Sequence, residues 1–543
     1  MSRFTAILLF SCALSYAVAK KQPNIVFVIC DSMDGRVVDP TSSVSRTVKT
    51  PNFDSLAASG VNFVNNYCPS PQCVPSRSAM FSGRYVHRMK TWSNAQGLCV
   101  KWNKTDPAHC DDQGNNSYWQ TFDYQFEKAG YDVQLFGKVD VGGGIGGGFH
   151  GTSGSTYAGL TAWTRAANIT HPQKQDPRTL VNDNASSPFS GDASTIERCV
   201  KYLQDNANNS KPFFLYCGIN IPHPAYHTNK TWLAMVNESA VTMPTWIPYE
   251  KMHPADQFEA SSKALHYDGM KPFTKDDILS VRRTYYAMCA ETDYFLGEVV
   301  KALESVGKRD DTYIIFTSDH GEGNMEHMQT WKNSMYDANN KVPLIVSGPG
   351  VTKGNVVANA TSNLDLYPTM LDWAGLDVPS GLQLDGHSLS SFLVPGSSRQ
   401  TTSRPDFVFG EYHSNMANTG HFMIKRGNYK YIAFGQTPPY ENFKPQLFNL
   451  ATDPEEIDDI AESAPDIAAE MAKLMSSVAD IQAIDKECKD QDKVRFNMWF
   501  EQHKSTWVKE LGKAAYYGPG TEPFGSEEDL KKMATWINGT KYE

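Results

Sequence analysis

Four apolar runs constrain the fold of this chain more than any other feature of its sequence. They are NIVFVIC (24–30), PFFLYCG (212–218), TYIIFTSDHG (312–321) and VPLIVSG (342–348). Apolar runs without regular alternation are typical of strands that are buried on both faces of a parallel sheet. Helical patterns at 51–60 and about 275–307 lie between these runs, and a further helix and strand are predicted over 117–137. The alternation predicts an α/β domain with a mostly parallel sheet between helices.

The character of the sequence changes near Arg404. The stretches RPDFVFGEYH and HFMIKRGNYKYIAFG are typical of short, half-exposed strands joined by turns, and helical segments follow to the end of the chain. The stretch LVPGSSRQTTSR before them is typical of a linker. We therefore predict a large α/β domain over residues 20–402 and a smaller C-terminal α+β domain over residues 403–543.

The N-terminus is typical of a secretory signal peptide. Arg3 precedes the apolar stretch FTAILLFSCALSYAV, and Ala17-Val18-Ala19 is a small-residue cleavage site, so we predict a signal peptide over residues 1–19. No other stretch suggests a membrane span. The formal net charge of −10 argues against binding to nucleic acid or to an anionic membrane. We expect a protein of the secretory pathway that is secreted, delivered to the lysosome, or both.

The sequons and the cysteines agree with an oxidising compartment. The N-x-[S/T] sequons are Asn103, Asn115, Asn168, Asn184, Asn208, Asn229, Asn237, Asn359 and Asn538. Of the ten cysteines, Cys12 leaves with the signal peptide, and the odd number that remains includes at least one unpaired cysteine. Cys73 lies between two prolines in SPQCVPSRSAMFSG (70–83). It is either half of a disulfide or the substrate of another chemistry, and in the second case an even number remains.

Charged residues and histidines follow four of the predicted strands. Asp31 follows the strand at 24–30, Lys138 the strand at 132–137, and His223 the strand at 212–218, while Asp319 and His320 follow the strand that begins at 312. Each residue alone is more often a turn residue, a solvated lysine or a structural histidine. Because ligands bind beyond the carboxyl ends of parallel strands, the set as a whole predicts one shared site.

A helix is predicted directly after Cys73. Pro75 suits its first turn, and Gly83 suits its end. Cys73 would therefore lie at the positive end of the helix, where backbone N–H groups favour an anion. Six Lys or Arg residues and no Asp or Glu occur from Arg77 to Lys104. This basic segment predicts an anionic ligand, although a solvated helix face is the alternative.

The stretch around Cys73 resembles the signature of the sulfatase family, C-x-P-S-R followed by a small-residue helix and a glycine. Further pieces resemble the family in its own order: VICDSMDGR its first metal strand, FGKVD its lysine strand, SDHGE its second metal strand, and WKNSMYDA the segment with a second active-site lysine. GNYKYI and QLFNLATDPEE resemble its C-terminal domain. The resemblance covers nearly the whole mature chain and implies an alkaline-phosphatase-like fold.

The resemblance also implies a role for each matching residue. In this family the formylglycine-generating enzyme oxidises the cysteine in the endoplasmic reticulum, so Cys73 would become formylglycine (3-oxoalanine), whose hydrated aldehyde attacks sulfur with one hydroxyl and expels sulfate through the other. The implied catalytic residues are Cys73, Arg77, Lys138, His223 and Lys332. The implied ligands of one divalent metal ion, usually Ca²⁺, are Asp31, Cys73, Asp319 and His320. The implied substrate-binding residues are Lys138, His253 and Lys332.

Two positions depart from the family pattern. Asp319 is paired with His320, and a nitrogen ligand suits a transition metal better than it suits calcium. Asp140 stands two residues after Lys138, where the family commonly has a histidine. One polar contact to formylglycine or sulfate is therefore expected to come from elsewhere, and His150 is a candidate.

The resemblance also extends to one branch of the family, through the stretches MCAETD, MHPAD and SMYDANNKVPL. It implies the 2-O-sulfate of uronic acid residues in glycosaminoglycans as the substrate. His253 as an imidazolium, or the basic segment, would bind the uronate carboxylate, which predicts an acidic pH optimum. The alternatives are a general arylsulfatase acting on aryl sulfates, a phosphatase or phosphonate hydrolase on the same fold, and an inactive glycan-binding protein.

Overall fold

The computed structural model describes residues 22–94, 97–98, 120–141, 176–185, 191–266, 269–396, 404–414, 417–436, 442–506 and 527–538. Several predictions from the sequence fall outside these residues, namely the signal peptide, the contact from His150, and the sequons Asn103, Asn115 and Asn168. Within the described part, every helix is too short or too polar to cross a membrane.

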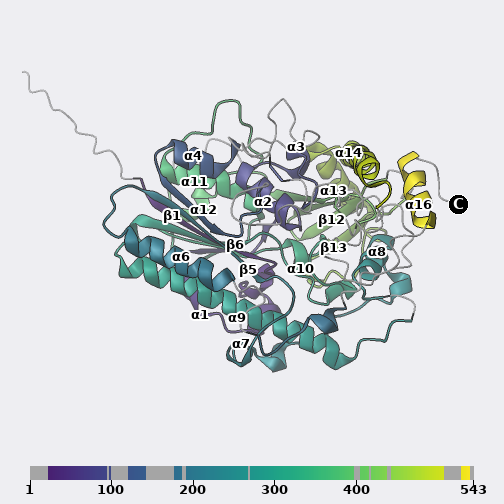
Figure 1. The fold of residues 1–543 in the computed structure, drawn as a ribbon, viewed down its shortest axis with the longest axis horizontal. Helices are drawn as coiled ribbons and strands as arrows, with labels where there is room; N and C mark the ends of the chain where they lie inside the picture. The colour runs from purple at the N-terminus through teal and green to yellow at the C-terminus, as the bar shows by residue number, and fades with distance from the viewer. Residues whose placement is uncertain are drawn as a thin grey trace, which may run out of the picture.

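A seven-stranded sheet forms the centre of the large part of the molecule, in the order β4-β5-β1-β6-β7-β2-β8 (Figure 1). Its strands are β1 (Asn24–Asp31), β2 (Val61–Phe63), β4 (Asp132–Gly137), β5 (Phe213–Pro222), β6 (Thr312–Ser318), β7 (Leu344–Ser347) and β8 (Asn355–Val357). β4, β5, β1 and β6 are neighbours and run parallel. The apolar runs therefore form one mostly parallel sheet, which confirms the predicted α/β fold class.

Strand β7 is the exception to the parallel arrangement. It runs antiparallel to both β6 and β2, whereas β2 and β8 are parallel to each other. A parallel strand requires a crossover that returns the chain to the opposite edge of the sheet, usually through a helix. Residues 319–343 contain only a short 3-10 helix (Glu326–Met328) and the short helix α10 (Asp337–Asn340), so β7 starts at the edge where β6 ends.

Helices cover both faces of the sheet (Figure 1). One face carries α1 (Pro51–Ala58), α6 (Gly191–Asp205) and α9 (Lys275–Ser305), and the other carries α2 (Cys73–Ser82), α4 (Phe122–Lys128), α11 (Leu366–Ala374) and α12 (Ser390–Leu393). In β1, Val26 and Val28 pack with the first group, while Ile25 and Phe27 pack with the second. Both faces are thus buried, which explains why the strand is apolar throughout.

Capping residues, a proline and a glycine in the sequence account for where these helices begin and end. Thr274 and Asp277 form a capping box at the start of α9, with each side chain accepting from the other residue's backbone N–H. Pro51 occupies the first turn of α1. Gly83 ends α2 with a φ of 65°, a left-handed conformation that glycine adopts without steric cost.

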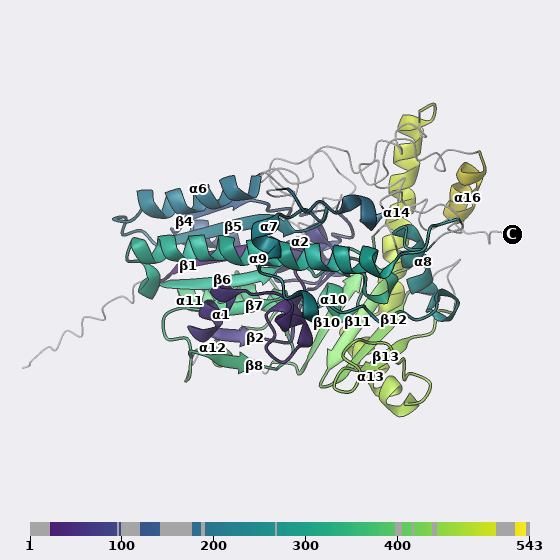
Figure 2. The same ribbon diagram turned by 90° about the horizontal axis from the view of Figure 1, so that it is seen from below.

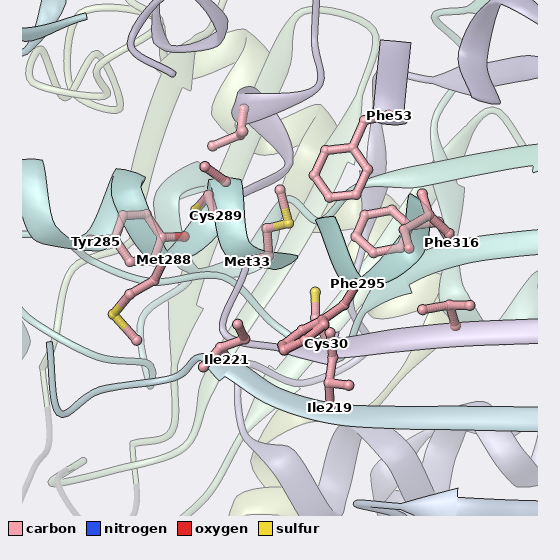
Figure 3. Close-up of a cluster of buried hydrophobic side chains, with 14 of the residues drawn as sticks. Cys30, Met33, Phe53, Ile219, Ile221, Tyr285, Met288, Cys289, Phe295 and Phe316 are labelled. Carbon is pink, nitrogen blue, oxygen red and sulfur yellow. The ribbon is translucent and has the colours of Figure 1, made fainter. Parts of the chain in front are cut away.

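The core between β1, β6 and α9 is packed with apolar side chains and thiols (Figure 3). Phe53 of α1 stacks on Phe316 of β6, with 4.3 Å between ring centroids. Met33, Cys30 and Cys289 are fully buried in the same cluster. Thiols in such surroundings act as small apolar groups.

The described cysteines fall into two groups. Cys199 of α6 is joined to Cys217 of β5 by a disulfide. The free and buried cysteines are Cys30, Cys68, Cys73, Cys289 and Cys488. Among the described residues Cys73 is therefore a free thiol, which favours the second of the two interpretations drawn from its proline-flanked position.

A second, antiparallel sheet lies toward the C-terminus, in the order β10-β11-β12-β13 (Figure 2). Its strands are β10 (Phe407–Tyr412), β11 (His421–Arg426), β12 (Tyr429–Phe434) and β13 (Gln446–Asn449), and the helices α13 (Pro465–Val478), α14 (Ile481–His503) and α16 (Glu527–Asn538) follow. The remaining elements include α3 (Val86–Met89), α7 (Lys230–Leu233), α8 (Pro254–Ser262), β3 (Asn66–Tyr67) and β9 (Thr361–Ser362). The predicted α+β character of this region is confirmed.

The core of the antiparallel sheet includes residues of the large α/β part. Phe409 and Ile424 of the antiparallel sheet share a buried cluster with Ala79 of α2 and with Trp92. The C-terminal region therefore packs directly against the helix that begins with Cys73. The boundary between residues 402 and 403 stays a prediction, since residues 397–403 are not described.

Gly218 provides a test of how closely β4 and β5 approach at the end of the sheet. A Cβ at this position would lie 2.1 Å from the Lys138 carbonyl oxygen, whereas a Cβ at Gly191 would meet no atom within 4 Å. We expect Gly218→Ala to lower the free energy of unfolding by about 2 to 3 kcal/mol, because backbone atoms cannot move aside cheaply. Gly191→Ala is the control and should leave stability nearly unchanged. Equal denaturant midpoints for both variants would contradict the close approach.

Candidate active site

Four neighbouring strands deliver the predicted residues to one edge of the sheet. Asp31 ends β1, Lys138 follows β4, His223 follows β5, and Asp319 with His320 follows β6. Because β4, β5, β1 and β6 are adjacent and parallel, their carboxyl ends lie side by side. The structure brings these five residues together, as the strand-end argument predicted.

Cys73 is the first residue of α2 and is 1% exposed. Its Sγ lies 2.7 Å from Lys332 Nζ, 3.4 Å from His320 Nε2 and 3.8 Å from Lys138 Nζ. Burial and the nearby Asp31 carboxylate raise the pKa of the Cys73 thiol to about 12, although the two lysines act against this. The side chain is therefore a neutral thiol, surrounded by groups that suit an anion.

Arg77 lies one turn after Cys73 and is fully buried. Its Nε donates to Asp319 Oδ2 at 2.7 Å, and its Nη1 donates to Lys138 O and to Tyr216 Oη, both at 2.8 Å. Burial alone would lower the pKa of Arg77, but Asp319 holds it well above the ordinary value. The guanidinium thus links α2 to the ends of β4 and β6 and to the middle of β5, and it remains charged. Tyr216, in the middle of β5, had no sequence signal that marked it for this contact.

The predicted metal ligands form a compact group. Ligand atoms of Asp31, Cys73, Asp319 and His320 all lie within 4.8 Å of one another. His320 Nδ1 donates to Gly321 O at 2.8 Å, so Nε2 presents its lone pair, 3.6 Å from Asp31 Oδ1 and 3.7 Å from Asp319 Oδ1. Two carboxylates and an imidazole lone pair in this arrangement fit a divalent cation.

Lys138 balances the charge of the same group. Its Nζ lies 2.5 Å from Asp31 Oδ2 and 3.3 Å from Asp140 Oδ2. Burial alone would raise the pKa of Asp31, but Lys138 lowers it well below the ordinary value, and Asp31 in turn holds the pKa of Lys138 well above its own. Both groups are therefore ionised. Asp140, the residue that replaces the family's usual histidine, contacts Lys138.

Lys332 reaches the site from the segment between β6 and β7. Its Nζ contacts Cys73 Sγ at 2.7 Å and His223 Nε2 at 3.2 Å, and no carboxylate pairs with it among the described residues. His223 Nδ1 donates to Pro224 O, so Nε2 accepts from Lys332. Burial and the Lys332 charge lower the pKa of His223 well below its ordinary value. The His223 ring is therefore neutral in this structure.

The loop that carries Lys332 is held in an unusual conformation. Its residues with positive φ are Asn324, Met325, His327, Met328, Trp331 and Asn333. Such conformations persist only where surrounding contacts determine them. Glu322 supplies several of these contacts, because its Oε1 accepts from Tyr226 Oη, from Asn324 N and from Trp331 N. The motif SDHGE contains Glu322, yet its role depends on contacts that the sequence does not reveal.

His253 does not join this group. It caps α8, where its Nδ1 accepts from Ala255 N at 3.2 Å, its Nε2 donates to Lys444 O at 3.0 Å, and its ring stacks on Phe434. Burial lowers the pKa of His253 to about 4. A neutral ring with both nitrogens engaged cannot act as the predicted imidazolium, so we assign it no substrate contact.

The basic segment also differs from the expectation. Arg88 Nε lies 3.3 Å from Asp385 Oδ1, and Lys90 Nζ lies 2.7 Å from Glu487 Oε1. These cations are paired with acids that are distant in the sequence, and residues 99–104 are not described. The positive charges of Arg88 and Lys90 are thus compensated by tertiary contacts, whereas Lys138 and Lys332 are the lysines whose Nζ atoms contact Cys73 Sγ.

Comparisons with known proteins agree with this geometry. The family model Sulfatase matches residues 23–376, and the model for the C-terminal part of N-sulphoglucosamine sulphohydrolase matches residues 325–483. Arylsulfatase K of Mus musculus is 35% identical over 498 residues, which are 88% of this chain and 83% of the mouse protein. Arylsulfatase K is the branch that the stretches MCAETD, MHPAD and SMYDANNKVPL resemble.

Solved structures share the fold. A phosphonate monoester hydrolase from Silicibacter pomeroyi has a TM-score of 0.62 at 21% identity, covering 84% of this chain and 94% of its own. A 2-O GAG sulfatase has a TM-score of 0.60 at 22% identity, covering 84% and 92%. At these identities the likeness shows the fold alone. The Sulfatase model, which matches more than half of the chain, and the mouse relative show the family. The chain therefore belongs to the sulfatase family and is a sulfuric ester hydrolase similar to arylsulfatase K.

Proposed function

We propose that this sulfatase removes the 2-O-sulfate of uronic acid residues in glycosaminoglycans through a formylglycine made from Cys73. The observation that carries the proposal is the setting of Lys332. Lys332 is 7% exposed, and its ammonium faces Cys73 Sγ at 2.7 Å without a carboxylate partner among the described residues. A buried cation of this kind is stabilised by an anionic ligand. A sulfate ester bound beside residue 73 would supply that negative charge.

The converted residue supplies a hydrated aldehyde, of which one hydroxyl attacks sulfur and the other serves to expel sulfate. Lys138 and Lys332 neutralise the charge that the sulfuryl oxygens carry in the transition state. The two side chains are 9% and 7% exposed, so water screens their charges little. Arg77 holds Asp319 and the Lys138 carbonyl, which keeps residue 73 and the strand ends in a fixed relation.

The leaving alcohol must take up a proton, and the Lys332–His223 pair is placed to supply it. His223 Nε2 accepts a hydrogen bond from Lys332 Nζ, so the proton at this end of the site resides on the lysine. We assign proton donation to Lys332 and the orientation of its ammonium to His223. This assignment makes His223 a contact of the leaving-group side without requiring it to be an imidazolium.

One divalent cation, Ca²⁺ in this proposal, would be held by Asp31, Asp319 and His320 together with the side chain of residue 73. When bound, it polarises the sulfuryl oxygens and favours a deprotonated nucleophile. Asp31 Oδ2 is held by Lys138, and Asp319 Oδ2 is held by Arg77. The Oδ1 atoms, which also accept hydrogen bonds from Ser32 and from the His320 backbone, lie beside His320 Nε2 and would face the cation together with it.

The likeness to arylsulfatase K supports the uronate 2-O-sulfate as substrate. Two of the stretches that carry the likeness belong to segments that adjoin the Lys332 loop. MHPAD opens α8, and Lys263 at the end of this helix contacts the backbone of Lys332. SMYDANNKVPL begins two residues after Lys332. A 2-O GAG sulfatase with the same fold shows that the fold can house such an activity.

We also propose that the protein matures in the secretory pathway and acts in the lysosome, outside the cell, or both. The Cys199–Cys217 disulfide suits an oxidising compartment. Asn184, Asn208, Asn237 and Asn359 are exposed and so accessible to glycosylation. Because Cys73 is 1% exposed in the folded chain, the formylglycine-generating enzyme would have to act before folding is complete.

The state of residue 73 is the first test. In protein from a host with the formylglycine-generating enzyme, peptide mass spectrometry should find an aldehyde at residue 73. Cys73→Ser should keep the melting temperature and lose turnover, because a serine sulfate has no second hydroxyl through which to expel sulfate. Wild-type protein from a host without the enzyme is the control and should be folded but inactive. Active protein with residue 73 entirely as a thiol or in a disulfide would refute the mechanism.

Metal dependence is the second test. Chelation should abolish the activity of the wild type, and Ca²⁺ should restore it and raise the melting temperature, since a ligand bound only by the folded state stabilises it by about 2.7 kcal/mol at 100 times Kd. Asp319→Asn, which keeps the size of the side chain, should show neither response. If the chelated wild type keeps full activity, the metal assignment is wrong. If Mn²⁺ or Zn²⁺ restores activity where Ca²⁺ does not, the metal site stands and only the assignment of Ca²⁺ is wrong.

Substrate preference is the third test. We expect a disaccharide with 2-O-sulfated uronate to be cleaved with a higher kcat/KM than disaccharides with 6-O- or N-sulfated glucosamine, an aryl sulfate, or an aryl phosphonate. His253→Asn, which preserves a capping side chain, should leave the pH profile unchanged, because a group with a pKa of about 4 stays neutral at higher pH. Preference for a glucosamine sulfate would overturn the substrate, and preference for the phosphonate would overturn the reaction.

A further inference from the structure

We propose that Lys263 is a positioning residue for Lys332. Its buried ammonium holds the backbone carbonyl of Lys332 and thereby fixes the second ammonium, which faces residue 73. This inference rests on the proposed role of Lys332 in binding sulfate. It concerns a residue outside the sulfatase signature, at the end of a helix that contributes no ligand to the site.

Lys263 is a buried lysine whose ammonium has two hydrogen-bond partners. The residue directly follows α8 and is fully buried. Its Nζ donates to Lys332 O at 2.7 Å and to Glu259 Oε2 at 2.9 Å, and Glu259 is 1% exposed. Lysine is almost never buried without partners. Here one partner balances its charge, and the other belongs to the active-site loop.

The backbone at Lys332 requires such support. Trp331 has a φ of 65° and Asn333 a φ of 93°, so Lys332 lies between two residues in the sparsely populated left-handed region. Trp331 N is held by Glu322, and Asn333 N donates to Pro71 O at 3.0 Å. The bond from Lys263 to the Lys332 carbonyl completes the set. The position of Lys332 is thus determined by contacts on both sides and at the residue itself.

Helix α8 also supports the loop at a second point. Asp256 Oδ2 accepts from Tyr336 Oη at 2.8 Å, four residues after Lys332. Glu259 Oε1 lies 3.6 Å from His421 Nδ1 of β11, so the same helix contacts the antiparallel sheet. The Glu259–Lys263 pair therefore connects the C-terminal region with the loop that presents Lys332. A charge-assisted hydrogen bond is about twice as strong as a neutral one, which suits a cation for this task.

The test removes the cation without leaving a buried charge alone. The double variant Lys263→Met/Glu259→Gln keeps the volume and the net charge of the pair, and such replacements of buried ion pairs are often tolerated. We expect its kcat/KM on the preferred sulfate ester to fall by about 100-fold, because small displacements of a charged group at the reacting centre cost that much. We also expect weaker inhibition by inorganic sulfate.

A matched pair elsewhere serves as the control. Lys489 and Asp485 form a fully buried i,i+4 ion pair at 2.8 Å within α14. Lys489→Met/Asp485→Asn should lower the melting temperature as much as the test variant does, but leave kcat/KM and sulfate inhibition unchanged. An equal loss of kcat/KM in both double variants would show a general effect of stability and overturn the proposal.

Making the same change in the Lys332→Ala variant distinguishes the positioning role of Lys263 from the proposed function of Lys332, on which it rests. If Lys263 acts through Lys332, the Lys263→Met/Glu259→Gln change should have no further effect on the binding of inorganic sulfate in that background. Additive losses would overturn the positioning role. If Lys332→Ala alone keeps wild-type kcat/KM, the proposed function of Lys332 fails. If Lys332→Ala loses activity while the double variant keeps it, the positioning role alone fails.

Discussion

The ion pair between Arg77 and Asp319 is the interaction on which the rest of the site depends. Both side chains are fully buried, and a charge at such depth is costly unless a partner compensates it. Arg77 belongs to the helix that begins with Cys73, whereas Asp319 follows β6, so the pair sets the position of the reactive side chain relative to the sheet. The same guanidinium holds Lys138 O and Tyr216 Oη, which orders β4 and β5 as well.

Carboxylates compensate the charge of only some of the buried cations in the site. Arg77 pairs with Asp319, and Lys138 pairs with Asp31. Lys332, in contrast, contacts a thiol and a neutral imidazole in the described part of the molecule. The pairs give the site its rigidity. Lys332, a cation without a carboxylate partner among the described residues, is the one that we propose to bind the anionic ester.

Much of this arrangement could be predicted from the sequence, because it depends on local patterns. Apolar runs identify strands that are covered on both faces, and a residue that follows such a strand lies at the ligand-binding edge whatever the rest of the fold does. Asp31 and Lys138 were found in this way. The direction of β7 could not be predicted, since an apolar run reads the same in both directions, and only the short connection from β6 decides it. The resemblance to sulfatases supplied Lys332, which no strand pattern marks.

The sequence by itself determined the family, the order of strands and helices, and the residue types available for chemistry. Only the tertiary structure decided which of those residues meet and in which charge state. His253 and His223 are both histidines in proline-containing stretches, yet one caps a helix against the C-terminal sheet and the other accepts from Lys332. Lys263 has no motif, and its role depends on a contact with a carbonyl 69 residues away. The physical reason is that pairing and desolvation depend on what packs around a group, and these neighbours come from distant parts of the chain.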